Sequence, residues 1–400
     1  MTAAAHRVGL ADILRRHESA YLATHGLSVA RAKAWRAIVA CRTAALGGHV
    51  EVCNACGVSR HVYHSCRNRH CPLCQTRAKE AWLVQRRREL LPVPYFHLVF
   101  TLPHDLNGLV GQRPRALYEM LFAAASGTLT EFAAHPRWLG GALAFTLVLH
   151  TWKQDLGRHV HAHALVAGGA LTAAGEWVAA KRGFLFPVQA LSKVFRGKFV
   201  AALTAERANG RADGVAALDD RAWRALLARL YAHAWVVYAK QPLGGPAQVL
   251  EYLARYTHRV AISNERIVGM EQGGLADGEV AFRVRRDATS GKKRTLRLPG
   301  TEFIDRFLQH VLPTGFKRIR HYGLLAPAHK TRLLALARTA LDAPTPDPVA
   351  TESVQAFMRR VARIELHACR HCGVGQFVVT CALMPLHAHG ASSRGPPCAH

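Results

Sequence analysis

Apolar and polar side chains alternate from His159 to Ala167, and this period of two predicts a β-strand. Successive side chains of a strand point to opposite faces of the sheet. One face of this strand is therefore apolar, and the other carries the imidazoles of His159, His161 and His163. Neutral imidazole is a common ligand of divalent transition metals, so the pattern favours part of a metal site. A histidine-rich strand on a hydrated sheet face is the alternative interpretation.

The same periodicities predict the other elements. Helices are expected within Val8–Cys41 (two or three), Ala78–Leu91, Pro114–Ala134, Val188–Ala208, Asp220–His233 and Glu302–Leu312. Strands are expected at Tyr95–Leu102, Leu143–Trp152, Trp235–Lys240, Val260–Ile262, Arg266–Met270, Val280–Arg286 and Lys293–Leu298. A short basic turn at residues 153–158 separates two of the strands, which should form an antiparallel hairpin. The expected fold class is α+β, with an antiparallel sheet and flanking helices.

A further helix is predicted at Val249–His258, which lacks glycine and proline and follows a Gly-Gly-Pro break. At about 100° per residue, Tyr252, Arg255, Tyr256 and Arg259 share one sector of this helix. Two phenols one turn apart, flanked by two guanidiniums, could be presented to an anionic ligand. The alternative is that the tyrosines pack at the boundary between core and solvent.

Ten cysteines are present, and several occur as CxxC pairs. Without the features of an export signal, such pairs favour metal binding over disulfides. Cys53/Cys56 and Cys71/Cys74 are separated by 14 residues, which suits a tetrahedral four-cysteine zinc site in a zinc-ribbon-like module. The intervening residues hold further candidates for one of the four positions: His64, Cys66 and His70. In the tail, Cys369 and Cys372 form half of a second site whose possible partners are Cys381, His387, His389 and Cys398.

The charge balance is strongly basic. Lysine and arginine outnumber aspartate and glutamate by 53 to 26, giving a net charge of +27. Such a charge favours a polyanionic partner, and nucleic acid before an acidic membrane. Solvated basic surface is the alternative for each basic stretch. The cations expected to contact DNA are Arg67 and Arg69 near the cysteines, Lys292 and Lys293 among the late strands, and Arg318 and Arg320 in a basic aromatic stretch.

Membrane and secreted locations are not favoured by the sequence. No apolar run approaches the ~20 residues of a membrane span. The first residues lack the charged and apolar regions of a signal peptide. We therefore expect a cytoplasmic, nucleoid-associated bacterial protein.

The strand with alternating histidines and the later YxxxY helix together resemble a known family. The combination is similar to HUH endonucleases with two tyrosines, and most closely to rolling-circle insertion-sequence transposases of the IS91 family. The supporting strings are SCRNRHCPLC at residues 65–74, PVPYFH at 92–97, WVVYAK at 235–240 and RYTHRVAISN at 255–264. The resemblance runs from about Ala11 to about Leu336.

The resemblance implies single-stranded DNA cleavage and strand transfer through a 5′-phosphotyrosine, with Tyr252 and Tyr256 as nucleophiles. It also implies that two histidines and a third polar ligand hold Mg²⁺ or Mn²⁺. The expected pair is His161 and His163, although His159 and His161 could form the pair instead. The preferred third ligand is Gln154, and the alternatives are His150 and His159.

The resemblance also suggests a division of the chain. The expected parts are a helical segment (1–45), a zinc-binding module (46–91), an HUH nuclease core (92–260), a basic β/α region (261–340) and a linker with tail (341–400). Two other functions remain open at this point. One is a rolling-circle replication initiator or relaxase with the same chemistry, and the other is a non-catalytic zinc protein that binds DNA.

Overall fold

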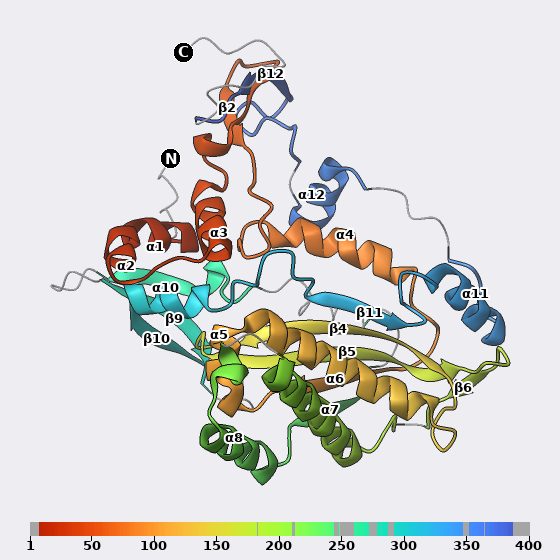
Figure 1. Ribbon diagram of the computed structural model, residues 1–400. Coiled ribbons are helices and arrows are strands. Elements are labelled where there is room, and N and C mark those ends of the chain that lie inside the picture. Colours follow the sequence, from red (N-terminus) through yellow and green to blue (C-terminus); the bar gives the residue numbers. More distant parts are fainter. Residues whose placement is uncertain are drawn as a thin grey trace.

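A six-stranded antiparallel sheet forms the centre of the computed structural model (Figure 1), which describes residues 8–181, 183–209, 213–243, 248, 260–271, 278–286, 292–346, 352–363 and 365–386. The strand order is β11-β4-β5-β3-β7, and β6 pairs with β5 outside this path. The strands are β3 (Tyr95–Thr101), β4 (Ala142–Trp152), β5 (Arg158–Leu171), β6 (Trp177–Ala179), β7 (Val237–Leu243) and β11 (Ile319–Gly323). Because β5 lies between β4 and β3, its side chains are buried on both faces from Val160 onward.

One face of the sheet is covered by helices α6 (Pro114–Ala134) and α7 (Val188–Asn209), which run side by side in Figure 1. Their apolar residues form the main core with Val160, Ala162 and Ala164 of β5. This is the apolar face that the alternation predicts. Shorter helices extend the layer: η2 (His104–Leu106), α5 (Asn107–Gln112), η3 (Gly214–Ala217) and α8 (Asp220–Ala232). Helix α6 begins at a proline, whose fixed φ suits the first turn and whose missing N–H is not needed there.

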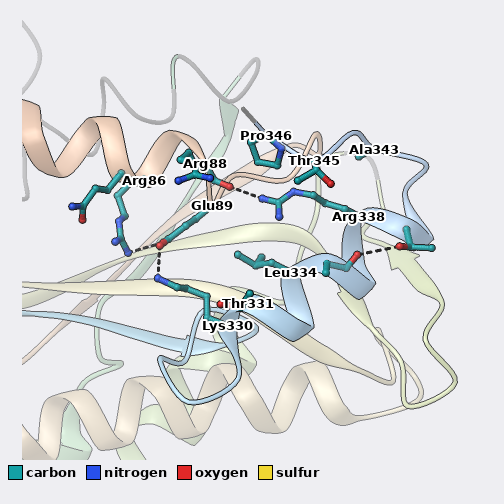
Figure 2. Close-up of a pocket in the computed structure, with 13 residues that line it drawn as sticks. Arg86, Arg88, Glu89, Lys330, Thr331, Leu334, Arg338, Ala343, Thr345 and Pro346 are labelled. Atoms are coloured by element: carbon teal, nitrogen blue, oxygen red, sulfur yellow. Dashed lines mark hydrogen bonds and ion pairs between the residues drawn. The ribbon is translucent and has the colours of Figure 1, made fainter. Parts of the chain in front are cut away.

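The opposite face is covered at one end by α11 (Lys330–Ala340) and by the segment that follows α4 (Gln75–Arg87). Leu165 and Ala167 of β5 pack there against Leu334 and Ala337 of α11. Figure 2 shows the pocket between the two helices, where Lys330 pairs with Glu89 and Arg338 donates to the carbonyl of Arg88. The other end of this face carries the histidines.

A second core joins the N-terminal helices to a later part of the chain. It lies between the N-terminal helices, α10 and a three-stranded sheet of order β10-β9-β8. The elements are α1 (Leu10–Arg16), α2 (Glu18–Thr24), α3 (Val29–Ala40), η4 (Asn264–Arg266), β8 (Ile267–Glu271), β9 (Glu279–Arg285), β10 (Lys293–Pro299) and α10 (Gly300–Leu308). Phe282 and Phe303 meet edge to face at its centre, with ring centroids 5.4 Å apart.

A third sheet stands apart from these layers and joins distant parts of the chain. Strand β1 (Gly48–Cys53), which follows η1 (Ala44–Leu46), pairs with β2 (Ser59–Tyr63) on one side and with β12 (Phe377–Leu383) on the other. Between α11 and β12 the chain forms α12 (Val354–Ala362), which lies beside α4 (Figure 1).

The predicted α+β class and the antiparallel hairpin of β4 and β5 are confirmed. The strand predicted at Val260–Ile262 is wrong: these residues form no strand, and Ala261 and Ile262 instead fill the second core from a loop. The helix predicted at Glu302–Leu312 starts at Gly300 and ends at Leu308. Strands β1, β2, β11 and β12 were not predicted. The predicted helix at Val249–His258, with Tyr252, Arg255, Tyr256 and the adjoining Arg259, lies outside the described residues.

Candidate functional site

Three imidazoles converge where β4 and β5 lie side by side. His150 of β4 lies opposite His161 of β5 in the strand register, and His163 follows two residues later on the same face. The Nε2 atom of His163 lies 3.1 Å from Nε2 of His161 and 3.2 Å from Nδ1 of His150. All three side chains are buried. The sheet therefore brings three nitrogen donors to one point.

Hydrogen bonds to the remaining ring nitrogens orient two of these imidazoles. Nδ1 of His161 lies 2.9 Å from the carbonyl oxygen of His159, which can only accept, so Nδ1 carries the proton and Nε2 is left free to coordinate. Nδ1 of His163 lies 2.9 Å from Nε2 of His97, a buried residue of the neighbouring strand β3. Such outer partners set the tautomer and the ring plane of metal-binding histidines.

Burial keeps His161 neutral. Burial, together with a smaller effect of the nearby His159, lowers the pKa of this imidazole to about 4. The ring of Trp152 stacks on His150, with centroids 4.8 Å apart. Neutral imidazole is the form that binds a metal, so at neutral pH no proton has to leave His161.

The spacing of the three nitrogens fits one divalent ion. A metal–nitrogen distance of about 2.1 Å places neighbouring ligand atoms about 3.0 Å apart in octahedral and 3.4 Å apart in tetrahedral geometry. The two separations at His163 fall in this range, and the three donor atoms lie within 4.8 Å of one another. His150, His161 and His163 are therefore the residues that could hold the ion.

The other two histidine-site candidates lie elsewhere. Gln154 is held by residues of β9 and η4: its Oε1 accepts from the backbone N–H of Arg285 at 3.1 Å, and its carbonyl accepts from Arg266. His159 lies 3.3 Å from His104, outside the three-histidine cluster. The preference for Gln154 as the third ligand is thus not supported, because its side chain points to β9. A turn centred between residues 155 and 156 places His150, one of the alternative third ligands, opposite His161.

Among the described residues, eight cysteines form two clusters of four. Cys71 and Cys74 join Cys41, at the end of α3, and Cys66. Cys53 and Cys56 join Cys369 and Cys372. Within the first cluster, Cys74 Sγ lies 3.5 Å from Cys41 Sγ and 3.7 Å from Cys66 Sγ. A Zn–S distance of about 2.3 Å gives tetrahedral edges of about 3.8 Å, so this spacing suits zinc.

The predicted grouping of Cys53, Cys56, Cys71 and Cys74 around one ion is therefore wrong. The two pairs belong to different clusters, because strand β1 carries Cys53 into the sheet with β12 while Cys71 packs against α3. Of the additional candidates, Cys66 is in the first cluster. His70 is not, and its Nε2 accepts instead from the backbone N–H of Leu312. His64 is exposed and belongs to neither cluster.

The predicted DNA-binding cations fall into two groups. Arg67, Lys292 and Lys293 are exposed. The other three are engaged inside the protein. Arg69 donates to the carbonyl of Phe316 at 2.6 Å, and burial lowers the pKa of Arg318 to about 10.

Arg320 is held most firmly. Its two terminal nitrogens donate to Glu119 at 2.6 and 2.7 Å, and its guanidinium lies over the ring of Phe122. This side chain joins β11 to α6, and it is not presented to a ligand in this arrangement.

The fold and the clusters define a class: a strongly basic α+β protein with a cysteine-bound zinc module and a separate three-histidine centre. Residues 13–102 match a family model described as a transposase zinc-binding domain, and residues 144–332 match one described as a putative transposase. No solved structure matches the chain.

Two relatives extend the match over most of the chain. A putative transposase, y4qJ of Sinorhizobium fredii, is 44% identical over 92% of this chain and 94% of its own length. The transposase for insertion sequence element IS801 of Pseudomonas savastanoi is 25% identical over 88% of this chain and 84% of its own. The chain belongs to the IS91 family of transposases, whose members act on DNA. No helix among the described residues has the length and apolar character needed to cross a membrane.

Proposed function

We propose that this transposase cuts single-stranded or melted DNA at the ends of a mobile element and transfers the strand through a 5′-phosphotyrosine, in rolling-circle transposition. The observation that carries the proposal is the convergence of His150, His161 and His163 on one face of the sheet. A cluster of neutral imidazoles at metal-binding spacing, in a DNA-processing family, suits phosphodiester chemistry. We also propose that residues 92–260 supply the nuclease core and residues 46–91 most of the zinc module.

Tyr252 and Tyr256 are the proposed nucleophiles. A phenol oxygen attacks phosphorus, and the 3′-oxygen leaves as a hydroxyl while the phenol loses its proton. The phosphodiester is conserved as a 5′-phosphotyrosine, and a second hydroxyl can later attack phosphorus and release the tyrosine. A phenol has a pKa of about 10, so Arg255 and Arg259 are proposed to favour its ionised form.

The described residues that flank the tyrosines support this role. Leu243, at the end of β7, pairs with Tyr95 at one end of the sheet. Val260 lines a small pocket with Thr151 and Trp152, at the end of the sheet that carries the histidines. The chain is thus found again, at Val260, at the end of the sheet where His150 lies.

The three histidines would hold the divalent ion. A bound ion would polarise the scissile phosphate and offset the charge that develops on its oxygens. Mg²⁺ prefers oxygen ligands and near-octahedral hydration, whereas imidazole suits transition metals. Between the two expected cofactors, an all-nitrogen set favours Mn²⁺ over Mg²⁺. His97 keeps the Nε2 of His163 directed into the site.

The exposed cations are proposed to contact the DNA backbone. Arg67, Lys292 and Lys293 lie on loops or at a strand end, and their exposed side chains suit phosphate contacts. Such contacts make binding sensitive to salt without making it dependent on the metal. Arg69, Arg318 and Arg320 are proposed to support the fold of this region rather than to bind phosphate directly.

The proposal is tested by incubating the protein with a labelled single-stranded oligonucleotide from the element end and Mn²⁺, followed by a denaturing gel. We expect a covalent adduct that maps to Tyr252 or Tyr256 and is lost in the double Tyr→Phe variant. His163→Ala should abolish the adduct but keep salt-sensitive DNA binding. His159→Ala is the matched control, because this histidine lies on the same strand outside the cluster. Undiminished cleavage by His163→Ala would refute the metal assignment.

A second pair of variants tests which residue is the third metal ligand. His150→Ala should weaken Mn²⁺ binding and cleavage, and Gln154→Ala should leave both nearly unchanged. The opposite result would favour Gln154 as the third ligand, as expected from the sequence. Each variant is checked for folding by circular dichroism, because His150 is buried.

A further inference from the structure

The second cysteine cluster draws its ligands from opposite ends of the chain. Cys53 Sγ lies 3.7 Å from Cys372 Sγ, and Cys56 Sγ lies 3.8 Å from Cys369 Sγ. A disulfide would require about 2.05 Å, whereas a tetrahedral zinc–thiolate site has edges of about 3.8 Å. We propose that these four cysteines bind a second zinc ion, which clasps the C-terminal tail onto the N-terminal module.

The two contributing loops have the same local structure. Each reads CxxCG, and the glycine has a positive φ, 74° at Gly57 and 75° at Gly373. In each, the glycine N–H donates to the carbonyl of the first cysteine at 3.0 Å. The turns that present Cys53/Cys56 and Cys369/Cys372 are therefore equivalent halves. Paired knuckles of this kind are what a tetrahedral zinc site requires.

Two hydrogen bonds also join the halves. The N–H of Asn54 donates to the carbonyl of Gln376 at 3.0 Å, and the N–H of Gln376 donates back to Asn54 Oδ1 at 2.8 Å. A Cβ atom at Gly375 would lie 2.4 Å from Cys53 Sγ, so only glycine allows the second loop to approach this closely.

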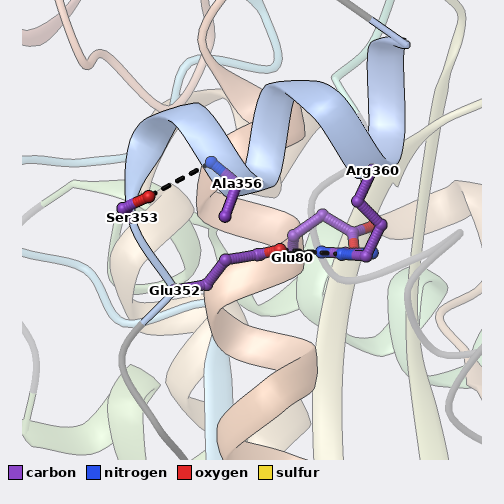
Figure 3. Close-up of polar contacts among 5 residues, drawn as sticks. All are labelled: Glu80, Glu352, Ser353, Ala356 and Arg360. Carbon is purple, nitrogen blue, oxygen red and sulfur yellow. Dashed lines mark hydrogen bonds and ion pairs between the residues drawn. The ribbon is translucent and has the colours of Figure 1, made fainter.

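Further contacts hold the tail along the same side. Arg60 of β2 pairs with Glu51, donates to the carbonyl of Leu366 at 2.5 Å, and lies 3.8 Å above the ring of Phe377. Figure 3 shows the next contact, where Arg360 of α12 reaches Glu80 of α4 and also pairs with Glu352. The tail thus follows a defined path from α4 to β1.

These contacts alone make a weak core. The apolar cluster at the junction contains the buried Cys53, Cys369 and Phe377, with the partly buried Cys372 beside it. A unit with so little apolar surface depends on a metal or another cross-link. The tail lies beyond both matched family segments, which end at residues 102 and 332, so neither match assigns it this role.

The first test counts zinc in the purified full-length protein by elemental mass spectrometry. Relative to the unsubstituted chain, Cys369→Ser/Cys372→Ser should lose one zinc ion, and so should Cys53→Ser/Cys56→Ser. The variant with all four substitutions should also lose only one, because the two pairs share the ion. His371→Ala, an exposed position inside the same loop, is the matched control and should lose none. No loss in the tail variant, or two ions lost in the fourfold variant, would overturn the proposal.

A second test avoids reliance on cysteine variants that could fail to fold. A protease site is placed in the linker at residues 343–346, and the folded zinc-containing protein is cut there. The tail fragment should co-elute with the rest of the chain in gel filtration and should separate when a chelator is added. Separation before chelation, or co-elution after it, would contradict the clasp. Neither test involves DNA cleavage, so the outcome is independent of the nuclease proposal.

Discussion

His97 provides a sharp test of how the histidine centre is organised. Its Nε2 lies 2.9 Å from Nδ1 of His163, and the two rings are stacked with centroids 5.1 Å apart. If His97 accepts the Nδ1 proton, the Nε2 of His163 is free to bind a metal. His97→Ala removes this acceptor, so His163 can also adopt the tautomer in which Nε2 carries the proton.

The magnitude follows from the kind of contact. Removing an outer hydrogen-bond partner of a metal ligand typically weakens metal affinity by about 10–100-fold, or about 1.4–2.7 kcal/mol. We therefore expect the Kd for Mn²⁺, measured by electron paramagnetic resonance of free and bound ion, to rise by that factor in His97→Ala. His97→Gln, which retains an acceptor oxygen, should recover part of the affinity.

The structure offers a matched control for this variant. His104 contacts His159 as His97 contacts His163, with ring nitrogens 3.3 Å apart, but His159 lies outside the cluster. His104→Ala should leave the Kd unchanged. An unchanged Kd in a folded His97→Ala protein would refute the orienting role, and an equal loss in His104→Ala would show that the effect is not specific to the centre.

Three further predictions concern stability. Arg320→Lys should lower the free energy of unfolding by about 1–2 kcal/mol in urea titrations, since lysine cannot reproduce the bidentate pair with Glu119 or the stacking on the aromatic rings; equal stability would contradict this. Burial lowers the pKa of His310 to about 4 from an ordinary 6.5, so below pH 6.5 the unfolded state binds more protons than the folded state. The free energy of unfolding should therefore decrease as the pH is lowered from 6.5, by about 3 kcal/mol at pH 4. His310→Gln should flatten this pH dependence in urea titrations. Gly323→Ala should lower the free energy of unfolding by about 1–3 kcal/mol or more, because φ is +59° and a Cβ would lie 1.8 Å from the carbonyl oxygen of Leu143. Gly315 also has a positive φ but faces open space, so Gly315→Ala should be less destabilising in thermal melts.

The hairpin that carries the histidines could be predicted from the sequence because its geometry is local. Alternation fixes which side chains share a face, and a short turn fixes the register between the strands. His161 and His163 follow from the alternation, and His150 follows from the register. The strand β11 could not be found in this way. Its residues are mostly polar, so no apolar alternation marks it as a strand. It is placed at the edge of the sheet by pairing with β4 and by the contact of Arg320 with Glu119 of α6, 201 residues away in sequence.

The cysteine assignment failed for a different physical reason. A CxxC knuckle contributes two ligands with correct local geometry, but nothing local selects which second pair completes the tetrahedron. The chain offers three such pairs, which begin at Cys53, Cys71 and Cys369, together with the single cysteines Cys41, Cys66, Cys381 and Cys398. Two complete sites need eight ligands, and a chain with ten cysteines leaves open which eight are used. The partners of Cys53 and Cys56 lie 319 and 313 residues away, so the choice depends on the pairing of β1 with β12. Because Cys41 and Cys66 complete the site at Cys71, the pair at Cys53 is left to close on the tail. The proposed zinc site between the tail and the N-terminal module therefore depends on the pairing of β1 with β12, which the sequence does not show.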